Sequence, residues 1–366
     1  MDIINELMSY RERDIPYSRV LSSMCTVPHP VAVKAHEIFI ETNLGDPGIF
    51  VGTIELEKKT IEMIGELLNN RNASGYICSG GTEANIQGIR AARNLKKVKD
   101  PNIVIPKSAH FSFEKIGDIL GVEIRRAALN KDYTVSISDV DRLVDENTVA
   151  LVGIAGTTEL GQVDNIKELG KIAEENGVFL HVDAAFGGLV LPFLSRHIPF
   201  DFEIRGVSSI TVDPHKMGMA TIPAGGILFR DERFLRALEV ETPYLTSKYQ
   251  YTLTGTRPGT GVASTYAVLK HLGYDGMKEM VDGCIRNTRT LVEEMEVLGF
   301  EPVVEPLMNV VSFHAKNPEE IKEELYRRKW VISTIRNPKA IRMVIMPHVT
   351  EEVIGSFISD FRKIIS

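Results

Sequence analysis

The stretch "SSITVDPHKMG" places a lysine, Lys216, directly after a run of strand-forming residues. A lysine at the buried end of a strand loses hydration, which favours its neutral amine, a nucleophile that forms a Schiff base with an aldehyde. His215 adds a second polar side chain at the same strand end. Because lysines are most often exposed, a surface loop without chemistry is the alternative interpretation of this motif.

The segment "SGGTEAN", residues 79–85, joins a predicted strand to a predicted helix. Its two glycines permit close backbone approach, and the helix N-terminus offers free N–H groups and the positive end of the helix dipole. Ser79 and Thr82 add hydroxyl groups. The segment therefore predicts a phosphate cradle, although it lacks the lysine of a P-loop and the GxGxxG spacing. A capped turn without a ligand is the alternative.

In "HVDAAFGG", His181 and Asp183 are two positions apart on a predicted strand and so share one of its faces. A buried carboxylate without a partner is costly, which predicts a partner for Asp183. Two alternatives remain open. Asp183 could cap the following turn, or it could bind a metal with His181 and either His110 or His215, although the spacing matches no recognised metal motif.

Together these motifs supply what pyridoxal 5'-phosphate (PLP) requires: a phosphate cradle, a Schiff-base lysine and a buried acid around one flat ring. The helix N-terminus would bind the phosphate, and Lys216 would bind the aldehyde. Asp183 would keep the pyridine nitrogen protonated, so that the ring draws electrons from a bound substrate. His110, after the strand "NIVIP", is a candidate on grounds of position, although a lone histidine there is more often a hydrogen-bonded core residue.

These motifs belong to a chain in which strands and helices alternate. Apolar positions in residues 53–70 recur at helical spacing. Beyond them, apolar strands without polar alternation are separated by helices, which predicts an α/β fold with a mostly parallel sheet buried on both faces. In such sheets, ligands bind where strands end. The predicted strands lie within 76–81, 102–106, 122–127, 149–158, 178–185, 208–214 and 225–231, and the helices between them within 82–97, 112–120 and 166–177.

From about residue 262 the pattern changes to two long helical stretches, roughly 262–298, followed by the strands "NVVSFHA", "WVIST" and "AIRMVIMP" with further helices. This pattern predicts a smaller α+β domain. The chain is thus expected to comprise an N-terminal segment (1–52), a large PLP-binding domain (53–261) and a small C-terminal domain (262–366).

The composition limits the possible functions. The 366 residues carry 42 basic and 49 acidic side chains, a net charge of −7, which disfavours nucleic-acid binding because phosphate contacts need clustered Lys and Arg. Cys25, Cys78 and Cys284 lie far apart and predict neither a disulfide framework nor a zinc site. The N-terminus lacks the apolar stretch of a signal peptide, and no run approaches the ~20 apolar residues that span a bilayer. We expect a cytoplasmic, membrane-independent protein.

The motifs "ETNLGDPGIF", "SGGTEAN", "AHFSFEK", "GIAGTTELG", "HVDAAFGG", "DPHKMG", "GTRPGTG" and "RMVIMPH" together resemble those of the group II PLP-dependent amino-acid decarboxylases. The resemblance covers nearly the whole chain and is strongest to compact archaeal members that act on L-tyrosine and L-aspartate. It implies the PLP-dependent transferase fold type I, like that of aspartate aminotransferase, and a homodimer with active sites at the subunit interface.

The resemblance also implies roles for individual residues. Lys216 would bind the cofactor's aldehyde, and Asp183 would pair with its pyridine nitrogen. The remaining cofactor contacts would be Ser79, Gly80, Thr82, His215 and, from the partner chain, Thr256 at the phosphate; Ala185 and His110 on the two ring faces; and Thr157 near the phenolic oxygen.

Four residues would take part in catalysis: Lys216, Asp183, His110 and, at the substrate carboxylate, Arg257. A tyrosine or His110 would protonate the α-carbon, and the family's mobile-loop tyrosine has three candidates here, Tyr244, Tyr249 and Tyr251.

The implied reaction is decarboxylation of L-tyrosine to tyramine, of L-aspartate to β-alanine, or of both, feeding the biosynthesis of methanofuran and coenzyme A. Glutamate is a third candidate substrate. Aspartate needs a second cationic contact, for which Lys248, Arg257 and His29 are candidates.

Two rival functions share parts of this pattern. A PLP-dependent C–C lyase of the sphingosine-phosphate-lyase type would use the same cofactor residues but would need a cationic cluster for a substrate phosphate. A non-catalytic protein that binds PLP or a metal would need no substrate site at all.

Overall fold

The computed structural model describes residues 2–365. The chain divides into two compact units, residues 28–281 and residues 1–27 together with 282–366. All the candidate site residues belong to the first unit, here called the larger unit. The domain boundaries expected at 52/53 and 261/262 stay a prediction.

The larger unit is built on a seven-stranded sheet with the strand order β1-β7-β6-β5-β4-β2-β3. Only β7 runs against its neighbours, so six strands point in one direction, and the predicted mostly parallel α/β sheet is confirmed. The strands are β1 (Ser74–Cys78), β2 (Asn102–Pro106), β3 (Glu123–Ala127), β4 (Thr148–Ile154), β5 (Phe179–Asp183), β6 (Val207–Val212) and β7 (Gly225–Phe229).

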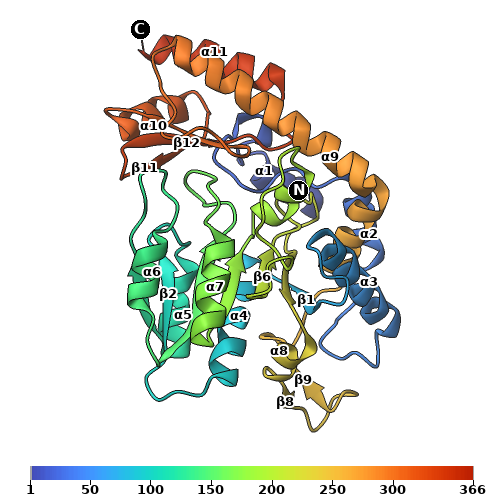
Figure 1. Ribbon diagram of the computed structural model, residues 1–366. Helices are drawn as coiled ribbons and strands as arrows, with labels where there is room; N and C mark the ends of the chain where they lie inside the picture. The colour runs from blue at the N-terminus through green and yellow to red at the C-terminus, as the bar shows by residue number, and fades with distance from the viewer. Residues whose placement is uncertain (1, 366) are drawn as a thin grey trace. The chain divides into compact units, whose positions relative to one another are not determined.

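Helices cover both faces of this sheet (Figure 1). On β5, His181 contacts α4: a Cβ on Gly88 of that helix would lie 2.4 Å from the Nδ1 atom of His181. Val182, the next residue, pairs with Gly153 of β4, which packs against Ile166 of α7. Because neighbouring strand residues point to opposite faces, α4 and α7 lie on opposite sides of the sheet. The helices of this unit before the last one are α2 (Pro30–Ile38), α3 (Val51–Leu67), α4 (Gly81–Leu95), α5 (Ser112–Leu120), α6 (Ile137–Leu143), α7 (Ile166–Asn176) and α8 (Glu232–Arg236).

Helix α6 was not predicted. It spans seven residues, too few for an apolar period to appear, and its start is fixed locally by the Ser136 side chain, which accepts a hydrogen bond from the Asp139 N–H. The two long helical stretches expected near 262–298 are both present within α9 (Thr260–Val297), where the backbone of Gly273 leaves the helical conformation (φ 61°, ψ −167°) and separates one helix from the next. The boundary between the two units falls within this helix.

The second unit contains a three-stranded antiparallel sheet in the order β10-β12-β11, which confirms the small C-terminal α+β region. Its core is aromatic: Trp330 packs edge-on against Phe357, and Phe361 packs edge-on against Phe300. Its elements are α1 (Ile3–Arg11), β10 (Val310–His314), α10 (Pro318–Arg327), β11 (Ser333–Ile335), β12 (Ala340–Val344) and α11 (Glu351–Ile365).

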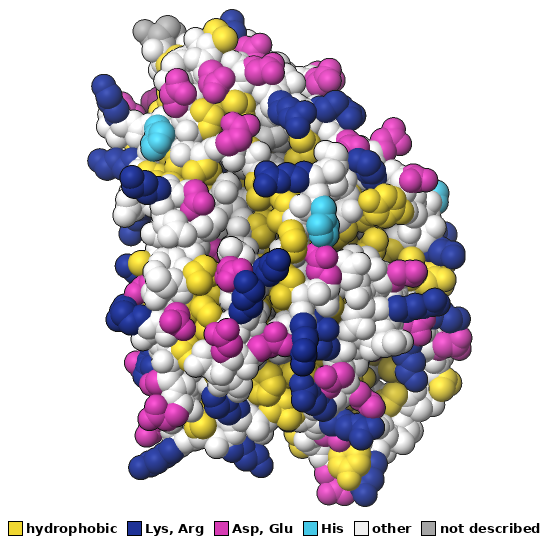
Figure 2. Space-filling model, viewed as in Figure 1, with side chains coloured by type: hydrophobic (Ala, Val, Ile, Leu, Met, Phe, Trp, Pro, Cys, Tyr) yellow, Lys and Arg dark blue, Asp and Glu magenta, His cyan; other side chains and the backbone are white. Residues whose placement is uncertain are grey.

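On the face that Figure 2 shows, basic and acidic side chains are interspersed rather than gathered into a basic patch. This mixture agrees with the net charge of −7 and disfavours a nucleic-acid surface there. Within residues 2–365, no helix has the length and apolar content that crossing a bilayer requires.

Gly225 on β7 packs directly against the backbone of the loop after β1. A Cβ at this position would lie 2.3 Å from the Cα of Gly80 and 2.6 Å from its nitrogen. Both contacts are backbone, so the substitution Gly225→Ala must displace a strand or the loop. We expect the free energy of unfolding in urea to fall by about 1 to 3 kcal/mol. The control is Gly52→Ala in α3, where no atom lies within 4 Å of the added Cβ; equal stabilities of the two variants would contradict the prediction.

Candidate functional site

Five of the candidate residues follow different parallel strands and therefore meet at one edge of the sheet. Ser79 follows β1, His110 follows β2, Thr157 follows β4, Asp183 ends β5 and Lys216 follows β6. The Lys216 side chain is only 19% exposed, which excludes the surface-loop interpretation of this lysine in the structure.

The loop before α4 has the close packing that a phosphate cradle requires. A Cβ on Gly81 would lie 3.0 Å from an Asp213 oxygen and 3.2 Å from the Cβ of Ala185, and one on Gly80 would lie 3.2 Å from the His215 ring. Gly80 also has a φ of 156°, which side-chain-bearing residues rarely adopt. The backbone at the start of α4 thus approaches the Lys216 loop with no side chain between them, and its N–H groups fit an anion there.

A buried carboxylate lies directly beneath this cradle. Glu83, 5% exposed, accepts hydrogen bonds from the backbone N–H of Ser79 (2.9 Å) and from its hydroxyl (2.7 Å). Ser79 therefore already donates its one hydroxyl proton to Glu83, so that backbone N–H groups are the donors available to a phosphate. Glu83 was missed by sequence reasoning, although a serine followed by a glutamate at a helix start resembles a capping box. Thr82, in the first turn of α4, is half-buried.

Lys216 is held by a second buried carboxylate. Its Nζ lies 3.0 Å from the Oδ2 of Asp213, which is 3% exposed, and the His215 Nε2 lies 3.7 Å from the same oxygen. Burial lowers the pKa of His215, whose Nδ1 accepts a hydrogen bond from the Ala224 N–H. The Oδ1 of Asp213 is buried without a hydrogen-bond partner, so the structure has an unused acceptor beside the lysine.

Asp183 is held on the α4 face of the sheet by neutral donors. Its Oδ2 accepts from the Asn85 amide (2.9 Å), and its Oδ1 accepts from the Ala185 N–H (3.1 Å). Among the residues described, 2–365, no cationic side chain bonds to this carboxylate, so its charge stays available for a cationic partner such as a protonated ring nitrogen. The alternative prediction, that Asp183 caps the following turn, also holds in part, because its side chain accepts the hydrogen bond from the Ala185 N–H two residues later.

Asn85 links Asp183 to a buried polar network that sequence reasoning missed. Its amide nitrogen also donates to Ser112 (3.1 Å), and its oxygen accepts from the Thr211 hydroxyl (2.7 Å) and faces the Nε2 of His181 (3.0 Å). Burial lowers the pKa of His181 to about 4. His181 is therefore neutral at pH 7 and supports the amide that orients Asp183.

His110 follows β2 and lies just before the start of α5. Its Nδ1 accepts a hydrogen bond from the Ser112 N–H, next to the Asn85 contact. Burial lowers the pKa of His110, while the charge of Asp183 raises it and that of Lys216 lowers it again. These electrostatic effects agree with the strand ends, which place His110, Asp183 and Lys216 at one edge of the sheet. Within residues 2–365 there is no group of three or more His, Cys, Asp or Glu side chains placed to hold a metal ion.

Two further candidates lie beside these residues. Thr157 is buried, and its hydroxyl accepts from the Gln162 N–H (3.0 Å) within the turn after β4. The carbonyl of Ala185 accepts from the Asp213 N–H (3.1 Å), which ties the loop after β5 to the loop that carries Lys216. Ala185 thereby joins the Asp183 side of the site to the Lys216 side.

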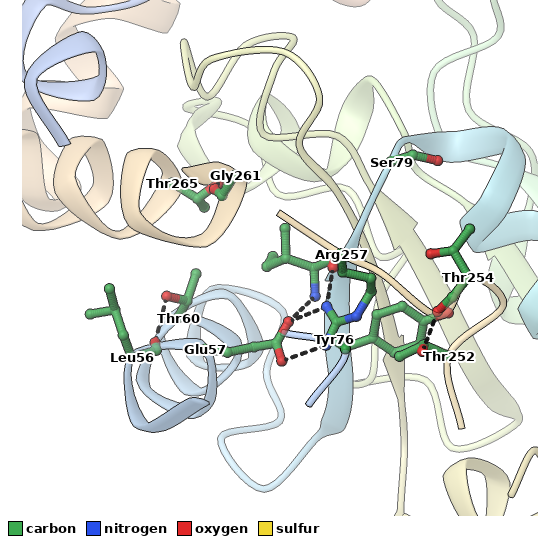
Figure 3. Close-up of polar contacts among 12 residues, drawn as sticks. Leu56, Glu57, Thr60, Tyr76, Ser79, Thr252, Thr254, Arg257, Gly261 and Thr265 are labelled. Carbon is green, nitrogen blue, oxygen red and sulfur yellow. Dashed lines mark hydrogen bonds and ion pairs between the residues drawn. The ribbon is translucent and has the colours of Figure 1, made fainter. Parts of the chain in front are cut away.

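Arg257, which follows Thr256, lies beside the last residues of β1, where its guanidinium donates to the Ile77 carbonyl. Arg257 is 4% exposed, and both its terminal nitrogens donate to the buried Glu57, at 2.7 and 3.1 Å (Figure 3). A substrate carboxylate would have to compete with Glu57 for this guanidinium, and the carboxylate-binding role stays a prediction. Thr256 is exposed, as a residue that reaches a partner chain must be, and that role also stays a prediction.

The three candidate tyrosines lie on the segment that precedes Arg257. Tyr244 is 85% exposed and Tyr249 is 43% exposed. Tyr251 is half-buried, and its ring centroid lies 5.8 Å from that of Tyr76. The identity of the proton donor stays a prediction.

The site fits a ligand with an anionic group, an aldehyde and a basic ring nitrogen, since it offers a glycine cradle, a lysine and an acid at one sheet edge. The family model described as "Pyridoxal-dependent decarboxylase conserved domain" matches residues 49–316. A protein of Archaeoglobus fulgidus named "Probable L-aspartate decarboxylase" is 73% identical over 365 residues, and the match covers 100% of this chain and 100% of that protein. A protein of Methanothrix thermoacetophila named "Probable L-tyrosine/L-aspartate decarboxylase" is 53% identical, over all of this chain and 95% of that protein.

Among solved structures, a glutamate decarboxylase of Lactobacillus brevis superposes with a TM-score of 0.92 at 21% sequence identity, over 100% of this chain and 91% of that one. At this identity the likeness shows the fold, which is that of fold-type I PLP-dependent enzymes.

The substitution His181→Gln tests the neutral histidine behind Asp183. The folded-state pKa of about 4 lies below the ordinary value of 6.5, so as pH falls below 6.5 the unfolded chain binds a proton that the folded chain does not. Stability is therefore lost between pH 6.5 and about 4. Glutamine does not titrate, so the loss in unfolding free energy between about pH 7 and about pH 4.5 should shrink by about 2 to 3 kcal/mol in urea titrations. An unchanged pH dependence would show that His181 is not the group responsible.

Proposed function

Because the chain belongs to the pyridoxal-dependent decarboxylase family, we propose that it decarboxylates L-aspartate to β-alanine and acts on L-tyrosine as a second substrate. The observation that carries this proposal is the meeting of Lys216, Asp183 and the Gly80–Gly81 cradle at one sheet edge. The 73% identical relative named for aspartate supports the first substrate, and the 53% identical relative named for both supports the second.

When bound, PLP supplies an aldehyde that takes up the substrate amine and a protonated ring that accepts the electron pair left by CO2. We propose that the backbone N–H groups at the start of α4 hold its phosphate, with His215 and Thr82 beside them. Lys216 captures the aldehyde, and Asp213 accepts a hydrogen bond from the lysine ammonium when the lysine is free. Asp183 holds the proton at the ring nitrogen, and Asn85 fixes the direction of that carboxylate.

We propose that His110 and Ala185 contact the two faces of the ring. Burial lowers the pKa of His110, so an uncharged imidazole packs against the ring at pH 7. An uncharged imidazole does not compete with the protonated ring nitrogen for the negative charge of Asp183. Thr157 would then face the phenolic oxygen from the turn after β4.

For the second carboxylate of aspartate, we propose His29 as the cationic contact. Its backbone N–H donates to the Met219 carbonyl (2.9 Å), and the Met219 N–H donates to the Lys216 carbonyl (3.1 Å), so His29 lies against the lysine loop. Burial lowers the pKa of His29, and the nearby His271 lowers it further. A substrate carboxylate would reverse that shift and favour the protonated imidazole. Lys248, by contrast, is exposed on the segment before Arg257.

We further propose a cytoplasmic homodimer. Helix α1 carries four large apolar side chains that are each more than half exposed, and such side chains are unfavourable on an isolated surface; they are Ile3, Ile4, Leu7 and Met8. The buried thiols of Cys78 and Cys284 form no disulfide, in agreement with a reducing compartment.

The reaction itself is tested by incubating the purified, PLP-loaded protein with L-aspartate, L-tyrosine and L-glutamate, each labelled at C1. We expect CO2 release with the highest kcat/KM for aspartate, lower values for tyrosine and the lowest for glutamate. Release of an aldehyde from a phosphorylated amino alcohol instead of CO2 would support a C–C lyase, and no product from any substrate would support a binding protein.

Substituting Asp183 tests the ring-nitrogen contact. We expect Asp183→Asn, which keeps the shape of the side chain, to reduce kcat by about 100-fold or more, equivalent to about 3 kcal/mol of transition-state stabilisation. The visible absorbance of the lysine-bound cofactor should be retained in this variant and lost in Lys216→Ala. The matched control is Asp118→Ala, on an exposed position of α5. Nearly full turnover of Asp183→Asn with PLP bound would overturn the assignment.

A further inference from the structure

A buried ion pair that the proposed mechanism does not use lies beside the phosphate cradle. Glu57 of α3 and Arg257 are each 4% exposed and form a two-point contact, Nη1 to Oε1 at 2.7 Å and Nη2 to Oε2 at 3.1 Å. Two charges are rarely buried together unless further hydrogen bonds compensate for their lost hydration. The additional contacts of this pair therefore indicate what it stabilises.

Both charged groups bind backbone atoms of the same residue of the edge strand β1, Ile77. The Oε1 of Glu57 accepts from the Ile77 N–H (3.0 Å), and the Nη1 of Arg257 donates to the Ile77 carbonyl (2.6 Å) (Figure 3). Strand β1 is hydrogen-bonded to β7 on one side only. The ion pair thus takes the place of a neighbouring strand on the free side, two residues before Ser79 and the cradle.

Arg257 also anchors the segment that carries Thr256 and the candidate tyrosines. Its backbone N–H donates to the Asn43 side chain (3.2 Å), and its carbonyl accepts from the Leu44 N–H (2.8 Å). Its guanidinium carbon lies 4.9 Å from the centroid of the Tyr76 ring. The end of this segment is therefore fixed at β1 by side-chain and backbone contacts together.

The hydroxyl of Tyr76 extends these contacts to the cradle. It donates to the Oε1 of Glu83 (3.3 Å) and accepts from the Leu253 N–H (3.3 Å). Glu83 in turn holds both the N–H and the hydroxyl of Ser79. A continuous set of contacts thus connects Glu57, through Arg257 and Tyr76, to the loop that is proposed to bind phosphate.

We propose that Glu57 is a positioning residue, which acts through Arg257 to fix the position of residues 242–256 relative to the phosphate cradle and thereby strengthens PLP binding. This inference rests on the proposed function, because it assigns the phosphate to the cradle after β1. It also changes the expected role of Arg257, whose terminal nitrogens are committed to Glu57 and Ile77, from contact with a substrate carboxylate to support of the cofactor site.

The test compares Glu57→Gln with Glu55→Gln. Both substitutions remove one negative charge from α3, but Glu55 is exposed and its ion pair is with Lys59 on the same helix. Glutamine at position 57 can still accept a hydrogen bond from the Ile77 N–H, which favours folding of the Glu57→Gln variant. If this variant does not fold, Glu57→Asp, which keeps the negative charge, replaces it in the test.

We expect Glu57→Gln to weaken PLP binding by about tenfold, measured by titrating the PLP-free protein with the cofactor. Trypsin should also cleave the PLP-free variant after the exposed Lys248 about fivefold faster than the wild type, because the segment opens more often. Glu55→Gln should match the wild type in both measurements, and Glu57→Asp should lie between the two. Since both residues act as one unit, the double variant Glu57→Gln/Arg257→Gln should bind PLP no worse than Arg257→Gln alone.

Unchanged PLP affinity and unchanged cleavage in a folded Glu57→Gln protein would overturn the inference. A large rise in substrate KM in Arg257→Gln with normal PLP affinity would also overturn it and would restore the carboxylate-binding role. If the wild type binds no PLP, the proposed function fails, whereas the trypsin comparison still decides whether Glu57 positions the segment.

Discussion

Six of the seven strands in the main sheet of the larger unit run in the same direction, and the positions of the five candidate residues at the strand ends depend on this. The parallel strands bring their carboxyl ends to one edge, so residues as distant in sequence as Ser79 and Lys216 become neighbours. The one reversed strand, β7, begins at this edge, and its Gly225 leaves room for Gly80. A side chain at either glycine would enter the space where the start of α4 meets the lysine loop. The cradle thus depends on strand direction as well as on local sequence.

Two buried carboxylates in this site have different partners, and the difference gives them different chemistry. Asp213 forms an ion pair with Lys216, so its charge is compensated within the protein. Within residues 2–365, Asp183 accepts hydrogen bonds from an amide and a backbone N–H and from no cationic side chain, so its charge remains available to a ligand. The network behind it, Asn85 and the neutral His181, is uncharged at pH 7 and adds no competing cation. Asp213 therefore compensates the charge of the lysine, whereas Asp183 is the carboxylate whose negative charge can act on a ligand.

The sequence predicted those parts of the fold and site that local pattern determines. Strand ends, the glycine pair and the lysine after "SSITVDP" are visible in short segments, because apolar runs and turn residues mark them directly. Helix α6 was missed because seven residues do not establish a period. Glu57 and Glu83 were missed for a different reason: a buried glutamate in an amphipathic helix resembles an exposed one until its partner is known. Arg257 lies 200 positions after Glu57, and no local pattern connects the two.

The site has two ends, one at Asp183 and one at Ser79, and the Glu57–Arg257 pair stabilises the Ser79 end. At the Asp183 end, neutral hydrogen bonds from α4 and the central strands hold the carboxylate, and the sheet continues on both sides. At the Ser79 end, β1 is an edge strand, and its outer backbone groups at Ile77 would face open space without Glu57 and Arg257. A charged pair binds a peptide N–H and a carbonyl more strongly than neutral side chains do, although it costs more to bury. The Glu57–Arg257 pair therefore stabilises β1, which has a neighbouring strand on one side only. The same pair also fixes the segment that ends at Arg257.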